Sequence, residues 1–271
     1  MNVSAINVYP IKSLRGTALV EAFVRSYGLE HDRRWMLVNP ASQMITQREC
    51  PLLATLIPHV EAAGLRVAAP GGREIFVPHD AGSWTNDEAV VDVWGHSYVG
   101  VAAVPAINQA LSEVIGMNCR LLSIRADVFR VKHDVAFHDD SPILIISESS
   151  LEELNRRLTK PLPMDRFRPN IVVRGAAPFD EDGWQRIAIG DAVFRAVKAC
   201  ERCVTTTVDQ ATGIPSGPEP LATLAKFRRK GAGVAFGQYY RPEQGTAIIR
   251  LGDAMTVLGA NSSQAAAQSS G

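Results

Sequence analysis

Short segments rich in β-branched and aromatic residues run through most of this 271-residue chain. Gly, Pro, Asn and Asp separate these segments, a pattern typical of strands joined by turns. The segments expected to form strands are residues 3–9, 18–27, 35–38, 65–68, 74–77, 89–93 and 98–101. The pattern therefore predicts a mainly β fold with some α-helix.

Three segments instead show the helical spacing of apolar residues. They are residues 105–115, 149–158 and 221–230. The second begins with a capping box, Ser149 and Glu152, in which each side chain bonds the backbone of the other. We expect only these three helices to interrupt the β-structure.

Two similar pieces in the C-terminal half, residues 186–194 and 248–258, each read as strand, Gly-Asp turn, strand. Such hairpins in a β-rich chain favour a closed or nearly closed barrel, which leaves few exposed edges. The helix at 105–115 marks a plausible boundary. We expect an N-terminal β-barrel-like domain at 1–118, a C-terminal β-barrel domain at 119–259 and a disordered tail at 260–271.

The bulk properties exclude several classes of protein. Lys plus Arg and Asp plus Glu balance at 28 each, so no net basic field attracts nucleic acid. The longest apolar stretch is far too short for a membrane span, and the N-terminus has no signal-peptide profile. Four scattered cysteines suit a reducing compartment. These properties indicate a cytoplasmic protein without a membrane span.

Cys200 and Cys203 form a CxxC pair with several possible meanings. Structural zinc needs four ligands, usually from a second Cys/His pair, and no such pair is evident. A redox dithiol would open a helix, whereas the run at 204–208 strongly favours a strand. Lys198 and Arg202 would favour a thiolate, which could be a nucleophile or a ligand for a soft metal centre. Two buried cysteines acting as small apolar residues remain the alternative.

Five polar clusters interrupt the β pattern. They contain Lys12, Ser13 and Arg15; Asp32, Arg33 and Arg34; Asp140 and Ser141; Arg166, Arg168 and Asn170; and Tyr239 in a Gly-aromatic turn. Lys, Arg and hydroxyl groups suit a phosphate, and arginine also stacks on heterocycles. Alternation along an extended chain would put Arg166, Arg168 and Asn170 on one side. Each cluster alone could equally be a solvated turn, a charged surface or, for Tyr239, the plug of a barrel end.

Taken together and in order, these motifs resemble the MOSC family of molybdenum-cofactor proteins, in the branch of mitochondrial amidoxime-reducing components and their bacterial homologues. The resemblance extends to about residue 259. It is carried by Tyr-Pro-Ile-Lys-Ser, Asp-Arg-Arg-Trp, Asp-Ser-Pro-Ile-Leu-Ile-Ile-Ser, Phe-Arg-Pro-Asn-Ile-Val, Cys-Glu-Arg-Cys-Val-Thr-Thr-Thr-Val-Asp-Gln-Ala-Thr-Gly, Glu-Pro-Leu-Ala-Thr-Leu and Phe-Gly-Gln-Tyr. It implies a MOSC N-terminal β-barrel-like domain, a MOSC barrel with a few helices, and a pyranopterin molybdenum cofactor (molybdenum-molybdopterin) held between them.

The resemblance also implies roles for particular residues. Cys203 would ligate the metal, because a soft thiolate suits a high-valent centre that already carries sulfur. Asp209 would lie where substrate reaches the metal and would handle protons or orient the substrate. The implied cofactor contacts are Lys12, Ser13, Arg33, Ser141, Arg168, Asn170, Glu201, Arg202, Cys203 and Tyr239.

The implied activity is molybdenum-dependent reduction of N-hydroxylated compounds such as amidoximes, hydroxylamines and N-hydroxylated bases. A plant-type iron–sulfur cluster needs four cysteines, and none follows residue 203. We therefore expect electrons from a separate ferredoxin- or cytochrome b5-like protein with its reductase. The alternative function is a non-catalytic carrier that holds the cofactor, or sulfur, on Cys203.

Overall fold

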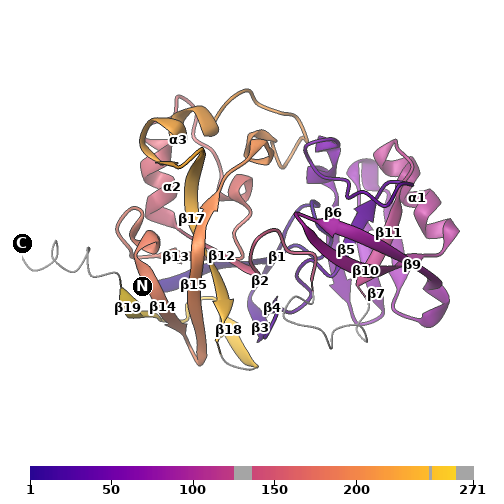
Figure 1. Ribbon diagram of the computed structural model, residues 1–271, viewed down its shortest axis with the longest axis horizontal. Helices are drawn as coiled ribbons and strands as arrows, with labels where there is room; N and C mark the ends of the chain where they lie inside the picture. The colour runs from indigo at the N-terminus through magenta and orange to yellow at the C-terminus, as the bar shows by residue number, and fades with distance from the viewer. Residues whose placement is uncertain (125–135, 244–245, 261–271) are drawn as a thin grey trace, which may run out of the picture.

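The computed structural model describes residues 1–124, 136–243 and 246–260. Two β-rich lobes lie side by side (Figure 1), and α2 and α3 cover the lobe that contains most of the C-terminal half. The helices are α1 (Pro105–Ile115), α2 (Glu148–Asn155) and α3 (Leu221–Phe227). Among the described residues, no helix is long and apolar enough to cross a membrane. The molecule is mainly β, as the sequence pattern predicts.

A nine-stranded sheet forms the larger lobe, and its strand order is β19-β14-β15-β17-β12-β13-β1-β2, with β16 attached to β17. Its strands are β1 (Asn2–Val8), β2 (Thr17–Leu19), β12 (Ile143–Ser147), β13 (Ile171–Arg174), β14 (Trp184–Ile189), β15 (Ala192–Glu201), β16 (Arg229–Lys230), β17 (Gly233–Pro242) and β19 (Met255–Ala260). Buried residues from both ends of the chain, among them Ile6, Ile171 and Phe194, share one core.

The two ends of this sheet approach each other near the N-terminus. The Met255 amide donates a hydrogen bond to the Met1 carbonyl (2.8 Å), and the Val3 amide donates to the Asp253 carbonyl (2.9 Å). Asn2 and Ala254 also form an isolated β-bridge. The described pairings do not complete a ring, but these bonds leave the sheet nearly closed, as the barrel prediction expected.

Three smaller sheets complete the fold, in the orders β5-β11-β10-β9, β6-β7-β8 and β18-β3-β4. Their strands are β3 (Glu21–Arg25), β4 (Gly28–Leu29), β5 (Trp35–Val38), β6 (Ile57–Glu61), β7 (Gly64–Ala68), β8 (Glu74–Pro78), β9 (Trp84–Val93), β10 (His96–Ala103), β11 (Arg120–Ile124) and β18 (Ala247–Arg250). The β5 and β6 sheets and α1 form the second lobe (Figure 1).

The helix predictions differ from the structure mainly at the ends. The helix at 105–115 is confirmed, and Gly116 ends it in the left-handed conformation. The capping prediction for α2 was wrong by two residues, because Ser147 rather than Ser149 caps the helix through the Ser150 amide. The helix beginning at Leu221 ends at Phe227, since the following residues turn into β16.

The two Gly-Asp pieces have different structures. The first forms the predicted hairpin, in which β14 pairs with β15. The second was wrongly predicted to be a hairpin, because β18 pairs with β3 whereas β19 pairs with β14. Local sequence gave the strands and the turn, but the partners come from distant parts of the chain.

The domain limits stay a prediction, and strands cross them. Strand β1 lies in the large sheet beside β13, whereas β11, beyond the predicted boundary at 118, pairs with β5 and β10. Within the predicted disordered tail, Ala260 ends β19, and residues 261–271 lie outside the described residues.

Candidate functional site

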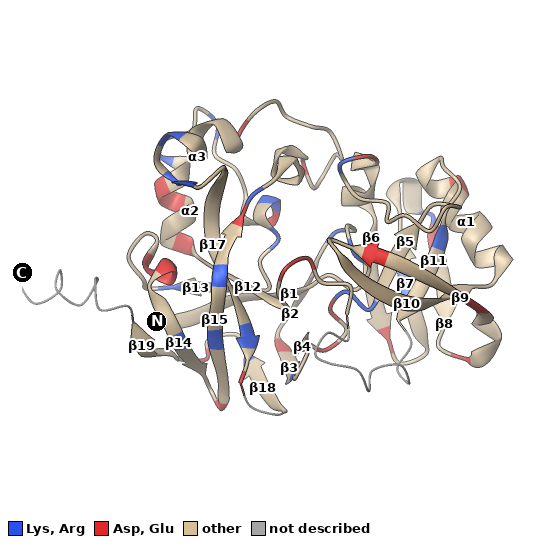
Figure 2. Ribbon diagram, viewed as in Figure 1, with Lys and Arg blue, Asp and Glu red and all other residues tan. Residues whose placement is uncertain are grey.

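A cleft of about 410 Å³ has walls from both lobes. All ten residues expected to contact a cofactor line it, although residues 12 and 239 are far apart in sequence. They are Lys12, Ser13, Arg33, Ser141, Arg168, Asn170, Glu201, Arg202, Cys203 and Tyr239. Six cationic side chains and three carboxylates line the cleft, so the site favours an anionic ligand. Figure 2 shows charged segments of both signs on the facing sides of the two lobes.

The backbone itself is unusual along this cleft. Ser13, Arg33, Trp94 and Arg168 have φ between 50° and 69°, in the left-handed region that non-glycine residues rarely adopt. The described chain has seven such residues, so four of them line one cleft. Backbone strain of this kind concentrates at functional sites, where it aims side chains that a relaxed chain would point elsewhere.

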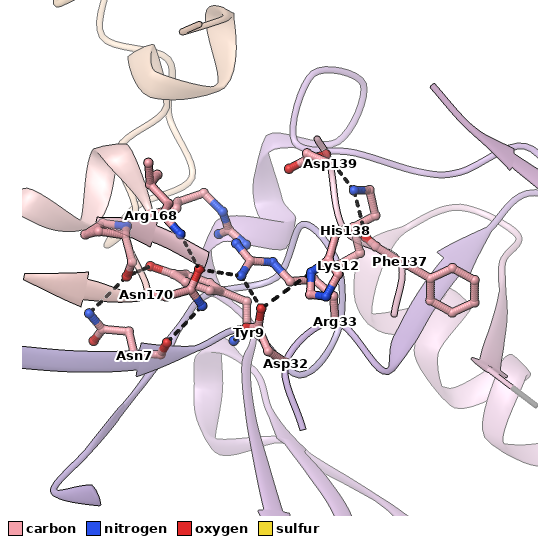
Figure 3. Close-up of polar contacts among 12 residues, drawn as sticks. Asn7, Tyr9, Lys12, Asp32, Arg33, Phe137, His138, Asp139, Arg168 and Asn170 are labelled. Carbon is pink, nitrogen blue, oxygen red and sulfur yellow. Dashed lines mark hydrogen bonds and ion pairs between the residues drawn. The ribbon is translucent and has the colours of Figure 1, made fainter. Parts of the chain in front are cut away.

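One end of the cleft holds the buried cations (Figure 3). Lys12 Nζ donates to Asp139 Oδ1 (2.5 Å) and to the Phe137 carbonyl (3.0 Å). Burial lowers the pKa of Lys12. Lys12 holds the pKa of the half-exposed Asp139 carboxyl well below its usual range. This ion pair and Arg33 both line the cleft.

Two arginines flank the ring of Tyr9 in the same region. The guanidinium of Arg33 lies 4.4 Å from the ring centroid, and that of Arg168 lies 4.3 Å from it. Arg33 pairs with the fully buried Asp32 and donates to Asn170 Oδ1 (3.1 Å). Arg168 donates to the Leu14 carbonyl (2.6 Å), and burial lowers its pKa to about 10.

These contacts leave the two arginines in different states. Asp32 pairs with Arg33 within the protein, whereas among the described residues Arg168 donates to a carbonyl, that of Leu14. A partly buried cation is stabilised when an anion accompanies it. Arg168 therefore offers a charge that a bound phosphate can neutralise.

The other end of the cleft holds Cys203, the exposed member of the CxxC pair. Its Sγ lies 3.3 Å from Arg48 Nη2 and 3.3 Å from Thr205 Oγ1. Burial alone would raise the pKa of the thiol, but hydrogen bonds from Thr205 and Arg48 outweigh it and lower the pKa. The arrangement presents to the cleft a thiol whose thiolate form is favoured.

Cys200 has the opposite environment. It is 1% exposed, and its Sγ accepts a hydrogen bond from Arg202 Nη1 (2.6 Å). Burial raises its pKa, although Arg202 opposes the shift. The two cysteines therefore differ in exposure and in the direction of their pKa shifts.

Of the two cations predicted to favour a thiolate at Cys203, Arg202 interacts with it electrostatically, but both make their hydrogen bonds elsewhere. Lys198 bonds Asp140 (2.8 Å), and Arg202 bonds Cys200 and the Phe167 carbonyl. Arg48, from the other lobe, supplies the contact to Cys203 instead. Sequence reasoning missed it because Arg48 belongs to no cluster. The only signal was its position in a polar Thr-Gln-Arg run after an apolar segment.

Several local predictions around the cleft also differ from the structure. The run after Cys203 forms a 3-10 helix, Val204–Thr207, rather than a strand. Tyr239 lies within β17 rather than in a turn. A side chain at Gly237 (φ +84°) would approach Ile146 Cγ1 to 2.6 Å, so only glycine fits this irregular point. Tyr239 consequently lines the cleft while Tyr240 is fully buried.

Arg166 and Asp209 lie outside the set of cleft-lining residues. Met164–Phe167 is a 3-10 helix, so the predicted alternation does not hold for Arg166. Arg166 donates to the Thr207 carbonyl (2.8 Å) and to Asp209 Oδ2 (2.9 Å). Asp209 Oδ1 accepts bonds from the amides of Ala211 and Thr212. The contacts of Asp209 are thus those of a turn, and its predicted proton-handling role stays a prediction that they do not support.

The environments of the cysteines predict selective alkylation. In cofactor-free protein, Cys203 is expected to react with iodoacetamide with a midpoint below its ordinary pKa of 9.0, because a lowered pKa leaves more thiolate at a given pH. Arg48→Ala should shift that midpoint upward. Peptide mapping by mass spectrometry across pH 6–10 would measure it. Cys50, Cys119 and Cys200 are buried with raised pKa and serve as internal controls. Faster labelling of Cys200, or an unchanged midpoint in Arg48→Ala, would contradict the assignment.

Comparisons with known proteins agree with this architecture. The family model described as the MOSC N-terminal beta barrel domain matches residues 1–118, and the MOSC domain model matches residues 132–256. Mitochondrial amidoxime-reducing component 1 of Mus musculus is 35% identical, over 95% of this chain and 82% of its own length. Mitochondrial amidoxime reducing component 2 of Rattus norvegicus is 36% identical, over 93% and 81%.

A third relative has a different name. Molybdenum cofactor sulfurase of Oryza sativa subsp. japonica is 30% identical over 88% of this chain, which corresponds to 32% of the sulfurase. The chain thus spans about a third of that protein but most of the amidoxime-reducing components. It belongs to the MOSC-domain family, in the branch that contains the mitochondrial amidoxime-reducing components.

Proposed function

We propose that this chain is a molybdenum-cofactor-dependent reductase of N-hydroxylated compounds, supplied with electrons by a separate protein. One observation carries the proposal. A single cleft joins an exposed thiol with a lowered pKa, Cys203, to a cluster of cations in which Lys12 and Arg33 are buried and Arg168 is partly buried. Relatives that cover most of the chain are named amidoxime-reducing components, which supports the same reaction class.

The chemistry of the donor set fits a pyranopterin molybdenum cofactor. Its phosphate would suit three cations of the cleft, Lys12, Arg33 and Arg168. Hydrogen bonds from a charged donor to an anion are stronger than those between neutral groups. Ser13, Ser141 and Asn170 offer hydroxyl and amide groups to the pterin edge. Cys203 offers an exposed thiol, which as a thiolate is a ligand that suits a soft or high-valent metal.

The bound cofactor would supply a two-electron centre that takes the oxygen of an N–O bond. The net reaction converts an N-hydroxy compound, two electrons and two protons into the amine-type product and water. Within the chain, Cys203 would hold the metal, and the contacts of Arg202 to Cys200 and Phe167 fix the strand end that carries Cys203. Arg48 places a hydrogen-bond donor beside the thiolate.

The electron donor in this proposal is a ferredoxin- or cytochrome b5-like protein with its reductase. The cytoplasmic location expected from the cysteines also stays a prediction. An assay with a reduced dye in place of the donor tests the chemistry without requiring the partner. Protein purified from a host that makes the cofactor should convert benzamidoxime to benzamidine; protein that carries molybdenum but reduces no N-hydroxy compound would contradict the proposal.

A second candidate function is a carrier of cofactor or sulfur without turnover. The match to a segment of molybdenum cofactor sulfurase favours it, together with the exposed Cys203 thiol. A carrier of sulfur should show a persulfide on Cys203 in the mass spectrum of freshly isolated protein. Reduction of benzamidoxime without any persulfide would favour the reductase.

A further inference from the structure

Trp94 lines the cleft and packs against Arg48, which contacts Cys203. The guanidinium of Arg48 lies 4.5 Å from the Trp94 ring centroid, and the same guanidinium reaches Cys203 Sγ (3.3 Å). Arg48 and Trp94 both belong to the lobe opposite β15. Together they line the side of the cleft that faces the strand end carrying Cys203.

The indole is held firmly in place. Trp94 occupies the turn between β9 and β10 with φ of 54°, a strained conformation for a bulky residue. Its Nε1 donates to Asp139 Oδ1 (3.0 Å), the same oxygen that accepts the bond from Lys12. A strained backbone and a fixed ring nitrogen together set the orientation of the indole plane.

Despite these contacts, Trp94 is 44% exposed. The other two aromatic residues lining the cleft are more enclosed: Phe167 is fully buried against Phe236, and Tyr239 is partly buried beside Cys200. Among the described residues lining the cleft, Trp94 therefore offers the most exposed aromatic surface. Backbone strain of this kind clusters at ligand-binding sites, and beside the contact with Arg48 the 44% exposed indole still has surface that a ligand can contact.

We propose that Trp94 is a specificity-determining residue that favours N-hydroxy substrates bearing an aromatic ring over alkyl ones. The exposed part of the indole packs against the ring of the substrate, while Arg48 donates a hydrogen bond to the oxygen of the N–O group. Offset stacking and edge contacts between aromatic rings account for the preference. This inference rests on the proposed function and identifies the substrate class of the same cleft.

Benzamidoxime and acetamidoxime form a matched pair for the test, because they share the reacting group and differ in the ring. In Trp94→Ala holoenzyme, kcat/KM for benzamidoxime should fall about tenfold, which corresponds to about 1.4 kcal/mol, within the range of aromatic pairs. The loss should appear mainly in KM. For acetamidoxime, kcat/KM should stay within about twofold. Trp94→Phe, which keeps an aromatic face but loses the bond to Asp139, should retain most of the preference.

Phe76→Ala is the matched control, since Phe76 is another exposed aromatic with an arginine over its ring (Arg66, 5.4 Å) and does not line the cleft. It should leave both substrates unchanged. Equal losses for both substrates in Trp94→Ala would overturn the proposal. So would Trp94→Phe behaving like Trp94→Ala, because the residue would then act through the Asp139–Lys12 contact rather than through its face.

Binding provides a readout that does not depend on turnover. Calorimetric titration of oxidised holoenzyme with benzamidoxime, without an electron donor, should give a Kd about tenfold weaker in Trp94→Ala and unchanged in Phe76→Ala. Equal Kd in wild type and Trp94→Ala would overturn the inference. If no N-hydroxy compound is reduced, the proposed function fails, and this titration still decides whether Trp94 recognises the ring.

Discussion

Cys203→Ala should remove bound molybdenum and reduce benzamidoxime turnover by more than about 100-fold. Substitution of a residue that hydrogen-bonds a metal ligand already lowers metal affinity or activity about 10–100-fold. Loss of the ligand itself should therefore lower them further. The fold should persist, because Cys203 is exposed and surface substitutions usually change stability by less than about 0.5 kcal/mol. Elemental analysis, turnover with a reduced dye and urea unfolding would measure the three quantities.

Cys200→Ala is the matched control for this prediction. Its thiol is buried, has a raised pKa and bonds Arg202 rather than facing the cleft. This variant should retain molybdenum, and its turnover should fall by less than about tenfold. Substitution of a residue that supports a metal ligand typically costs about 10–100-fold, so the expected loss lies below that range. Equal loss of molybdenum in both variants, or activity of Cys203→Ala equal to wild type, would contradict the assignment of the ligand.

Arg33→Met and Arg168→Met should both abolish cofactor retention yet differ sharply in stability. Arg33→Met leaves the fully buried Asp32 without its cation, which should lower the free energy of unfolding by about 3–5 kcal/mol. Arg168→Met removes the hydrogen bond from the guanidinium to the Leu14 carbonyl, and should lower the free energy of unfolding by about 1–2 kcal/mol.

Urea unfolding of cofactor-free protein would measure the stability of each variant. Elemental analysis of protein made with the cofactor would measure its molybdenum content. Together they test whether Arg168 serves mainly to bind the ligand while Arg33 also stabilises the fold. Equal destabilisation in the two variants would contradict it, and so would full molybdenum content in Arg168→Met.

Much of the cleft could be predicted from sequence, because its residues occur in compact polar motifs at strand ends. Lys12 and Ser13 follow β1, Arg168 and Asn170 precede β13, and Cys203 follows β15. Each motif places charge where an apolar strand would not tolerate it. Their joint order then identified one ligand that uses all of them.

The missed features depend on contacts that no local pattern encodes. Arg48 and Trp94 stand singly in the sequence and reach Cys203 and Asp139 only because the two lobes meet at the cleft. The 204–208 run has strong strand propensity, yet tertiary contacts turn it into a 3-10 helix. Asp209 lies close in sequence to Thr205–Thr207, but its carboxylate oxygens accept hydrogen bonds from Arg166 and from the amides of the following turn.

The central claim is that the cleft holds a molybdenum cofactor whose metal is bound by Cys203. Elemental analysis of wild-type protein, purified from a host that makes the cofactor, tests it most directly. We expect about one molybdenum atom per chain, lost in Cys203→Ala and kept in Cys200→Ala. Folded wild-type protein with no molybdenum, or with stoichiometric zinc in its place, would contradict it.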